Sequence, residues 1–472
     1  MTSADALQPT WLPGLHDHHI HLLAAAAALD SVKCGPPSVS TVEQLAEALR
    51  AAAQQRPPGS WIRGVGYHQS VAGDLDCGLL DRLCPGNPLR VQHRSGARWT
   101  LNTAAIDQLR GTIPAALLDH PGVDLLTGRI HRADEVIRGL PPHPDTAALE
   151  RLGVLLNSHG VTTVTDTTPF VSAADVAPLR ALTARLRITI TGSVQMLGQD
   201  PPPGLTLGPV KFVLDADDPP PWDDLVDQIR AAHAAGRAIA VHCVEADTLA
   251  LTLAALDAAD GGGDRGRGGG RGRGDAGQSM QNRIEHGALI DVQTIAELAR
   301  RRLRVVTQPS FVAERGDQYR TDVDPRRRAD LYRVRSLLDA GVDVSLSTDA
   351  PYTAPDPWAA IHAAVHRRAA SGHVLSPDER ITPDQALAAF TDHDDHDDHD
   401  DHDDHDDHDA DHDRPDRPDR PDRPDRPDRS DGIMLDRPWT AARRALADRS
   451  ADATVSQMVI ATVVRGRVVW RR

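Results

Sequence analysis

The chain has 472 residues, more than one hydrophobic core usually supports, so its length predicts two domains or one large α/β barrel with insertions. Its formal net charge is -16, but residues 392–413 contain fourteen aspartates and no lysine or arginine, which leaves only -2 for the remainder. A near-neutral remainder argues against nucleic-acid binding, and the sequence has neither an apolar run of ~18 residues nor a basic leader, so we expect a soluble, cytoplasmic protein that does not bind membranes.

Short apolar or β-branched segments alternate with Ala-, Leu- and Arg-rich helical segments, which is typical of a parallel sheet with crossover helices. Apolar residues recur near helical spacing in segments 222–235 and 292–301. The segments expected to form strands are Leu15–His21, Val161–Asp166, Ile188–Gln195, Pro209–Asp215, Ala238–Cys243, Arg283–His286, Leu303–Gln308 and Val342–Thr348. Eight such strands predict an α/β fold, a (β/α)8 TIM-type barrel within residues 11–390.

Two regions interrupt this pattern within the predicted barrel. Residues 30–150 are too long for one βα unit, so we expect a large insertion after the first strand, with strand-like segments at 61–64 and 89–93. Residues 261–277 are rich in glycine and arginine and have no apolar face, which predicts a flexible loop.

The sequence after the predicted barrel divides into two parts. Residues 391–431 consist of His-Asp-Asp and Arg-Pro-Asp repeats, whose charge and proline content predict disorder. Their histidines could chelate metal, although a solvated expansion is the favoured interpretation. Residues 432–472 end in VIATVVRGRVVWRR, whose alternation and Arg-Gly turn predict a β-hairpin outside the barrel.

Ionisable residues occur at several predicted strand ends, which is where catalytic groups lie in this type of barrel. The first strand ends in HDHHIH, where both His16/His18 and His19/His21 have the spacing that directs two imidazoles to one face. The pattern alone does not choose between these pairs. The later strands carry Lys211, His242, His286 and Asp349.

Lys211 stands out because it is one of only two lysines among 52 basic residues, so the chain otherwise uses arginine. The four cysteines include no C-x-x-C pair, and a metal site would therefore use histidine, a carboxylate or a modified side chain. A neutral lysine amine can react with carbon dioxide to form a carbamate, whereas arginine stays protonated.

The motifs PGLHDHHIHL, VKFVLD, IAVHC, NRIEHG and STDAP, in this order, resemble the metal-dependent amidohydrolase superfamily. The resemblance covers most of residues 11–390 and is greatest to the amidohydrolase 3 branch, which contains N-substituted formamide deformylases and D-aminoacylase-like enzymes. It implies the His19/His21 pair and one or two divalent metal ions per chain, with zinc expected. The implied metal ligands are His19, His21, Lys211, His242, His286 and Asp349, with Lys211 carboxylated.

The resemblance also implies hydrolysis of non-peptide carbon–nitrogen bonds in a small-molecule amide or N-acyl compound, by hydroxide that the metal activates. Asp349 and His286 are the implied catalytic residues, and Asp349 would transfer a proton from water to the leaving nitrogen. Glu285 is expected to be a structural or supporting acid rather than a ligand.

Three residues of the insertion are candidates for substrate binding: Trp99, Asn102 and Tyr67. A buried packing role for Trp99 and Asn102 is an equal alternative. Many relatives carry a histidine where this chain has Ala97, which puts one substrate contact in doubt.

Two other functions remain open at this point: a non-catalytic metal-binding protein that acts through the His/Asp repeats, and an impaired amidohydrolase homologue. The second arises because only about ten residues precede the first barrel strand, whereas relatives have roughly 50 there that complete a small β-sandwich. We therefore expect an incomplete C-terminal β module with unpaired strand edges, which would favour a homo-oligomer.

Overall fold

The computed structural model describes residues 9–133, 136–137, 140–141, 143–215, 219–261, 281–391, 431–448 and 457–472. The Gly/Arg-rich loop predicted at 261–277 and the repeats at 391–431 therefore lie almost wholly outside the described residues. Within the described residues, no helix is both long enough and apolar enough to cross a membrane.

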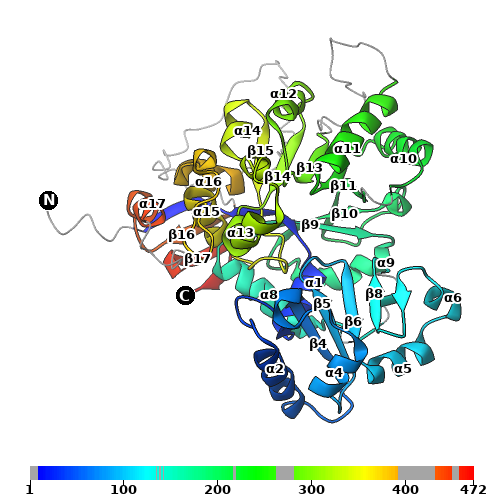
Figure 1. Cartoon of the computed structure of the whole chain (residues 1–472). Helices are drawn as coiled ribbons and strands as arrows, with labels where there is room; N and C mark the ends of the chain where they lie inside the picture. Colours follow the sequence, from blue (N-terminus) through cyan, green and yellow to red (C-terminus); the bar gives the residue numbers. More distant parts are fainter. Residues whose placement is uncertain are drawn as a thin grey trace, which may run out of the picture.

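An eight-stranded parallel sheet forms the centre of the molecule and closes almost completely into a barrel (Figure 1). Its strands, in chain order and in spatial order, are β2 (Leu15–Ile20), β9 (Val161–Phe170), β10 (Arg187–Gly192), β11 (Leu205–Val213), β12 (Ile239–Cys243), β13 (Arg283–His286), β14 (Arg304–Thr307) and β15 (Asp343–Leu346). Residues that directly follow the last strand are hydrogen-bonded to the first strand, from Asp349 N to His19 O at 2.8 Å and from Thr348 N to Asp17 Oδ1 at 3.0 Å. The predicted (β/α)8 TIM-type barrel is confirmed.

Helices cover the outside of the barrel (Figure 1). They are α1 (Leu22–Leu29), α8 (Thr146–Ser158), α9 (Ala173–Val176), α10 (Trp222–Ala234), α11 (Ala246–Ala259), α12 (Val292–Arg300), α13 (Ser310–Asp322), α14 (Arg335–Asp339), α15 (Pro357–His366) and α16 (Pro383–Thr391). The helix α12 illustrates why they form: Asp291 caps its first turn by accepting from Thr294 N at 2.8 Å, and Ile295 and Leu298 are buried one turn apart.

Each predicted barrel strand has a counterpart in the structure, with differences only at the ends. The strand β10 ends at Gly192 rather than Gln195, because Val194–Met196 form a 3-10 turn. The strand β9 runs on to Phe170, beyond the predicted end at Asp166. The core is built mainly from Leu, Val, Ile and Ala, as the low aromatic content predicts.

The segment between β2 and β9 forms a separate six-stranded mixed sheet, drawn in blue and cyan in Figure 1. The spatial order of its strands is β3 (Val32–Lys33), β4 (Ile62–Tyr67), β5 (Leu89–His93), β6 (Arg98–Leu101), β8 (Arg129–His131) and β7 (Val123–Asp124). Its helices are α2 (Val42–Gln54), α3 (Gln69–Ala72), α4 (Cys77–Leu83), α5 (Thr103–Thr112) and α6 (Ala115–Leu118). Leu45 and Leu49 of α2 pack with Ile62 and Leu89 in a hydrophobic cluster of the insertion.

A small antiparallel sheet joins both ends of the described chain. Its order is β1 (Thr10–Pro13), β16 (Gly432–Leu435), β17 (Val459–Val464) and β18 (Arg467–Arg471), and the helix α17 (Trp439–Ala447) lies between β16 and β17 in sequence. The hairpin partners β17 and β18 pair as the sequence suggests, but β17 also pairs with β16. The short N-terminal segment supplies β1, which pairs with β16, so both β16 and β17 have a partner strand on each edge.

Candidate metal centre

Ionisable side chains converge where five barrel strands end. His19 lies in β2 and His21 follows it, Lys211 lies in β11, His242 in β12 and His286 at the end of β13. Asp349 follows β15 by three residues. Because parallel strands of a barrel end on the same side, residues far apart in sequence share one site.

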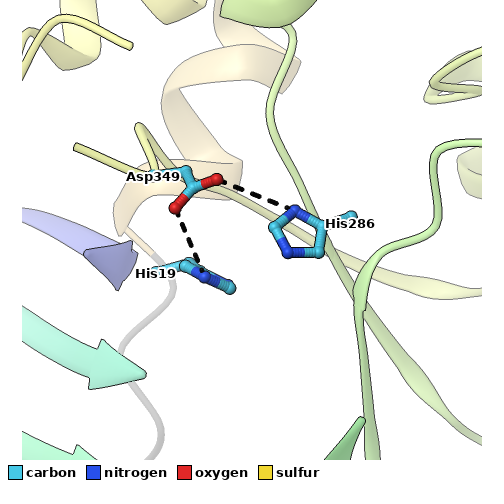
Figure 2. Close-up of side chains that lie close together, drawn as sticks. All are labelled: His19, His286 and Asp349. Carbon is cyan, nitrogen blue, oxygen red and sulfur yellow. Dashed lines mark ion pairs between the residues drawn. The ribbon is translucent and has the colours of Figure 1, made fainter. Parts of the chain in front are cut away.

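Three of these residues form the tightest group, shown in Figure 2: one ligand atom from each of His19, His286 and Asp349 lies within 4.8 Å of the others. The Asp349 carboxylate lies between the two rings, with Oδ1 3.5 Å from His19 Nε2 and Oδ2 3.9 Å from His286 Nδ1. His21 Nε2 also lies 3.4 Å from Asp349 Oδ1. This arrangement of imidazole and carboxylate groups is typical of zinc and related divalent metals.

The structure distinguishes between the two H-x-H pairs. His19 and His21 face Asp349, whereas the rings of His16 and His18 stack on each other at 3.7 Å and His16 Nε2 contacts Thr165 Oγ1 at 2.9 Å. The pairing register of β2 with β9 shifts between Asp17 and Ile20, so simple alternation does not extend through the motif.

Lys211 and His242 complete the ring of candidate ligands. The rings of His242 and His286 lie 4.4 Å apart. Lys211 is buried, and its Nζ has no hydrogen-bond partner among the described residues. Burial lowers the pKa of Lys211, although the nearby Glu285 carboxylate acts in the opposite direction. The amine is therefore closer to its neutral form than an exposed lysine would be.

Three of the candidate histidines, His19, His242 and His286, are also held in their neutral form. Burial, with a contribution from Lys211, lowers the pKa of His19 to about 4. Burial and the neighbouring His19 lower the pKa of His286 to about 3, and burial lowers the pKa of His242 well below its usual range. Burial alone would raise the pKa of Asp349, but His19, His286 and His21 together hold it below its usual range. Neutral imidazoles and an ionised carboxylate are the forms that bind metal.

Neighbouring polar groups fix the orientation of three of the four candidate imidazoles. His19 Nδ1 lies 2.5 Å from Glu285 Oε2, His286 Nδ1 lies 2.8 Å from Gln308 Oε1, and His21 Nδ1 lies 2.9 Å from Thr168 Oγ1. Such contacts leave the opposite ring nitrogen of each histidine for a metal ion. Sequence reasoning identified Glu285 as a supporting acid but missed Gln308 and Thr168, for which the only signal was their position at the ends of strands.

Two of the candidate ligands have left-handed backbone conformations, with φ of 71° at His286 and 56° at Asp349. This conformation is unfavourable for side chains other than glycine. Backbone strain of this kind persists where the surrounding structure enforces it, and it clusters at functional sites.

Comparison with known proteins is decisive for the family. A family model described as the amidohydrolase family matches residues 4–394, which is most of the chain. The chain belongs to the amidohydrolase family. Family membership confirms the prediction of an enzyme that hydrolyses carbon–nitrogen bonds, and the His/His/Asp group agrees with a metal-dependent reaction.

Two curated proteins are similar to this amidohydrolase. An N-substituted formamide deformylase from Arthrobacter pascens is 26% identical and covers 82% of this chain and 79% of its own length. The protein LONG AFTER FAR-RED 3 from Arabidopsis thaliana is 24% identical, with 81% of this chain and 74% of its own length covered.

Solved structures agree on the fold. An uncharacterized metal-dependent hydrolase from Pyrococcus horikoshii is 20% identical, with a TM-score of 0.60 and coverage of 81% of this chain and 80% of that one. A similar hydrolase from Pyrococcus furiosus is 21% identical, with a TM-score of 0.57 and coverage of 81% of both chains.

The three residues predicted to bind substrate lie within the insertion of this amidohydrolase and are buried. The guanidinium groups of Arg63 and Arg90 lie over the ring of Trp99, at 5.3 and 4.9 Å from its centroid. Asn102 caps α5 and accepts from Ala105 N at 3.0 Å, and the hydroxyl of Tyr67 donates to Gly73 O at 2.6 Å. These surroundings favour the packing role, and substrate binding by the three residues stays a prediction.

Proposed function

We propose that this amidohydrolase is a zinc enzyme that hydrolyses non-peptide carbon–nitrogen bonds in small amides or N-acyl compounds. The proposed ligands of one or two zinc ions are His19, His21, Lys211, His242, His286 and Asp349. The observation that carries the proposal is the buried Lys211 amine, which has no hydrogen-bond partner among the described residues and lies where charged neighbours surround it. A buried amine in this position is costly unless it is neutral or modified.

Carboxylation of Lys211 would remove the energetic cost of burying its unpaired ammonium group. A neutral amine attacks carbon dioxide, a nitrogen–carbon bond forms, and one proton is released, which leaves a carbamate with two oxygen donors. The carbamate oxygens could serve as ligands for divalent metal ions, which a lysine ammonium could not do. The lowered pKa of Lys211 supports the proposal because only the neutral amine reacts.

Bound divalent ions would polarise the substrate carbonyl and lower the pKa of water at the site. Side chains of the protein would carry out the proton transfer and orient the reacting groups. The Asp349 carboxylate, whose lowered pKa supports its ionised form, would accept a proton from the attacking water and donate it to the leaving nitrogen. His286 is fixed by Gln308 and lies against the same carboxylate, so it is proposed to orient Asp349 and the substrate carbonyl.

The similarity to an N-substituted formamide deformylase supports N-formyl compounds as the first substrates to examine. We also place the enzyme in the cytoplasm. All four cysteines are free thiols, and three of them are buried, which agrees with a reducing compartment.

Substitution of Lys211 tests the proposal. Lys211→Ala and Lys211→Arg should both lose hydrolysis of N-formyl and N-acetyl amides and should fall to one zinc ion or fewer per chain, measured by elemental analysis of zinc-reconstituted protein. Short carboxylic acids should partly rescue Lys211→Ala because they can supply the missing oxygens. The only other lysine provides a matched control, since Lys33 is exposed and Lys33→Arg should leave zinc content and activity unchanged.

Full activity and two zinc ions in Lys211→Arg would show that the lysine is structural. A second variant excludes metal storage by the His/Asp repeats, which lie outside the described residues. Deletion of residues 392–430 should leave hydrolysis and the zinc content of the barrel unchanged. A folded deletion variant without zinc would contradict the proposed ligands.

A further inference from the structure

The insertion reaches across the mouth of the barrel. On one side, the guanidinium of Arg315 donates to Arg94 O at 3.3 Å and to Tyr352 O at 3.1 Å, where Tyr352 follows β15. Gly96 lies so close to Tyr352 that an added Cβ would be 2.7 Å from the phenol oxygen. The segment 94–97, which links β5 to β6, is therefore fixed beside the end of β15.

The opposite side of the mouth is reached by the next strand pair. Arg132 follows β8, donates from its backbone N to Ala97 O at 2.8 Å and forms an ion pair with Asp215, just beyond β11. The strands β11 and β15 are four positions apart in the eight-stranded barrel, so they lie on opposite sides of it. The ends of β5, β6 and β8 thus cover the side of the barrel on which the candidate metal ligands lie.

This cover contains an open hollow of about 460 Å³, which we name the polar hollow. Its lining consists of Gln69, Asp74, His93, Ser95, Arg98 and His131. All six side chains are polar, so the hollow suits a hydrogen-bonding or charged group and not an aliphatic one.

Arg98 is the basic residue of the polar hollow, and Asp74 is its acidic residue. Its guanidinium pairs with Asp74 at 3.3 Å, but the Asp74 side chain is 63% exposed, and such a pair contributes little and is easily exchanged. Burial, followed by the charge of Arg98, lowers the pKa of His93 to about 4, so His93 is neutral near pH 7. His93 contacts Ser95 Oγ at 2.8 Å and Gln69 Oε1 at 3.0 Å, which orders the lining around Arg98.

We propose that the polar hollow binds a carboxylate group of the substrate, with Arg98 as the residue that determines this specificity. Two lining residues directly precede, in the sequence, the residues through which the insertion crosses the barrel mouth: Ser95 precedes Gly96, and His131 precedes Arg132. The Tyr352 ring, which an added Cβ at Gly96 would meet, stands edge-on to His21 at 5.7 Å, so Tyr352 lies between the segment 94–97 and the candidate metal centre. The inference rests on the proposed function, since the amide bond would lie at the metal while the carboxylate occupies the hollow.

Binding of compounds that cannot be hydrolysed tests the inference separately from catalysis. The probes are N-methylsulfonyl derivatives of glycine, β-alanine and 4-aminobutyrate, each compared with its neutral carboxamide by calorimetry on the zinc-loaded enzyme. At least one carboxylate should bind about 10- to 100-fold more tightly than its carboxamide, which is the range expected for a hydrogen bond to a charged group. Arg98→Gln should remove this preference without changing carboxamide binding.

Two further variants test whether the preference for the carboxylate depends on Arg98. Asp74→Asn releases Arg98 from its ion pair and should increase the preference for the carboxylate. Arg110→Gln is the matched control, because Arg110 lies in the same insertion, is 54% exposed and pairs with Asp107, but does not line the polar hollow. It should leave the preference unchanged.

The outcomes separate the two proposals. If no carboxylate binds more tightly than its carboxamide, or if the preference survives in Arg98→Gln, the inference is wrong even if the enzyme hydrolyses the corresponding N-acetyl compounds. If the preference depends on Arg98 but no N-formyl or N-acetyl amide is hydrolysed, with or without a carboxylate, the proposed function is refuted while the carboxylate site stands.

Discussion

Glu285 offers a direct test of how the candidate metal centre is held. Its side chain is fully buried, with Oε2 2.5 Å from His19 Nδ1 and Oε1 2.8 Å from Arg283 Nε. Burial alone would raise the pKa of Glu285, but Arg283, His19 and Lys211 hold it well below its usual range. The carboxylate is therefore ionised and balances the buried charge of Arg283. Glu285→Gln keeps the size of the side chain and removes this charge.

Two consequences are expected from Glu285→Gln. Removal of one partner of a buried ion pair costs about 3 to 5 kcal/mol, and because glutamine can still accept one hydrogen bond we expect the lower value, about 3 kcal/mol. The His19 ring also loses its ionised partner, and loss of such supporting contacts weakens metal binding by about 10- to 100-fold. Urea unfolding of the metal-free protein measures the first effect, and competition with a zinc indicator measures the second.

Glu297→Gln is the matched control. Glu297 lies on the surface in α12, pairs with Arg300 and Arg301 and has an exposed fraction of 31%. A pair of this kind is worth at most about 1 kcal/mol and has no contact with the candidate ligands. If Glu285→Gln changes stability and zinc affinity no more than Glu297→Gln does, the argument for a buried charge that orients His19 fails.

Two further predictions concern the insertion. The pKa of His93 falls from 6.5 to about 4 on folding, so between these values the unfolded chain binds more protons and stability falls as the pH decreases. Glutamine does not titrate, so His93→Gln should lose less free energy of unfolding than the wild type when the pH falls from 8 to 5. After allowance for the partial exposure of His93, we expect the difference, measured by urea unfolding, to be about 1 kcal/mol. An identical loss in the wild type and the variant would contradict the prediction. Asn102→Ala removes the cap of α5 and the acceptor of Leu89 N, so the free energy of unfolding should drop by ~2 to 4 kcal/mol with KM unchanged. A raised KM at normal stability would instead support a substrate contact.

The barrel was predictable because each of its strands carries a local signal. The segment Ala238–Cys243, for example, is a short apolar run with the candidate ligand His242 near its end, and a helical pattern follows it. Parallel strands linked by helices have few ways to pack, so the order of such segments is sufficient to predict the closed sheet. The same rule predicts from the sequence that Lys211, His242, His286 and Asp349 lie at one end of the barrel.

The choice between His16/His18 and His19/His21 had a different basis. Both pairs have the same spacing, and only the resemblance to a family favoured the second. The structure separates them through a register shift in β2, which depends on pairing with β9 almost 150 residues away. A local pattern cannot contain that information, because the shift arises from contacts between distant segments.

By itself, the sequence determined the barrel, the resemblance to the family and the positions of Lys211, His242, His286 and Asp349 at strand ends, since these depend on short segments and on the residues that end them. Only the tertiary structure decided that Trp99 and Asn102 are buried among polar partners, that the N-terminal segment pairs with β16, and that the insertion covers the barrel mouth through Gly96 and Arg132. Burial, edge pairing and the electrostatic environment of an ionisable group are set by which distant segments meet, and the pattern of residues along the chain does not specify these contacts.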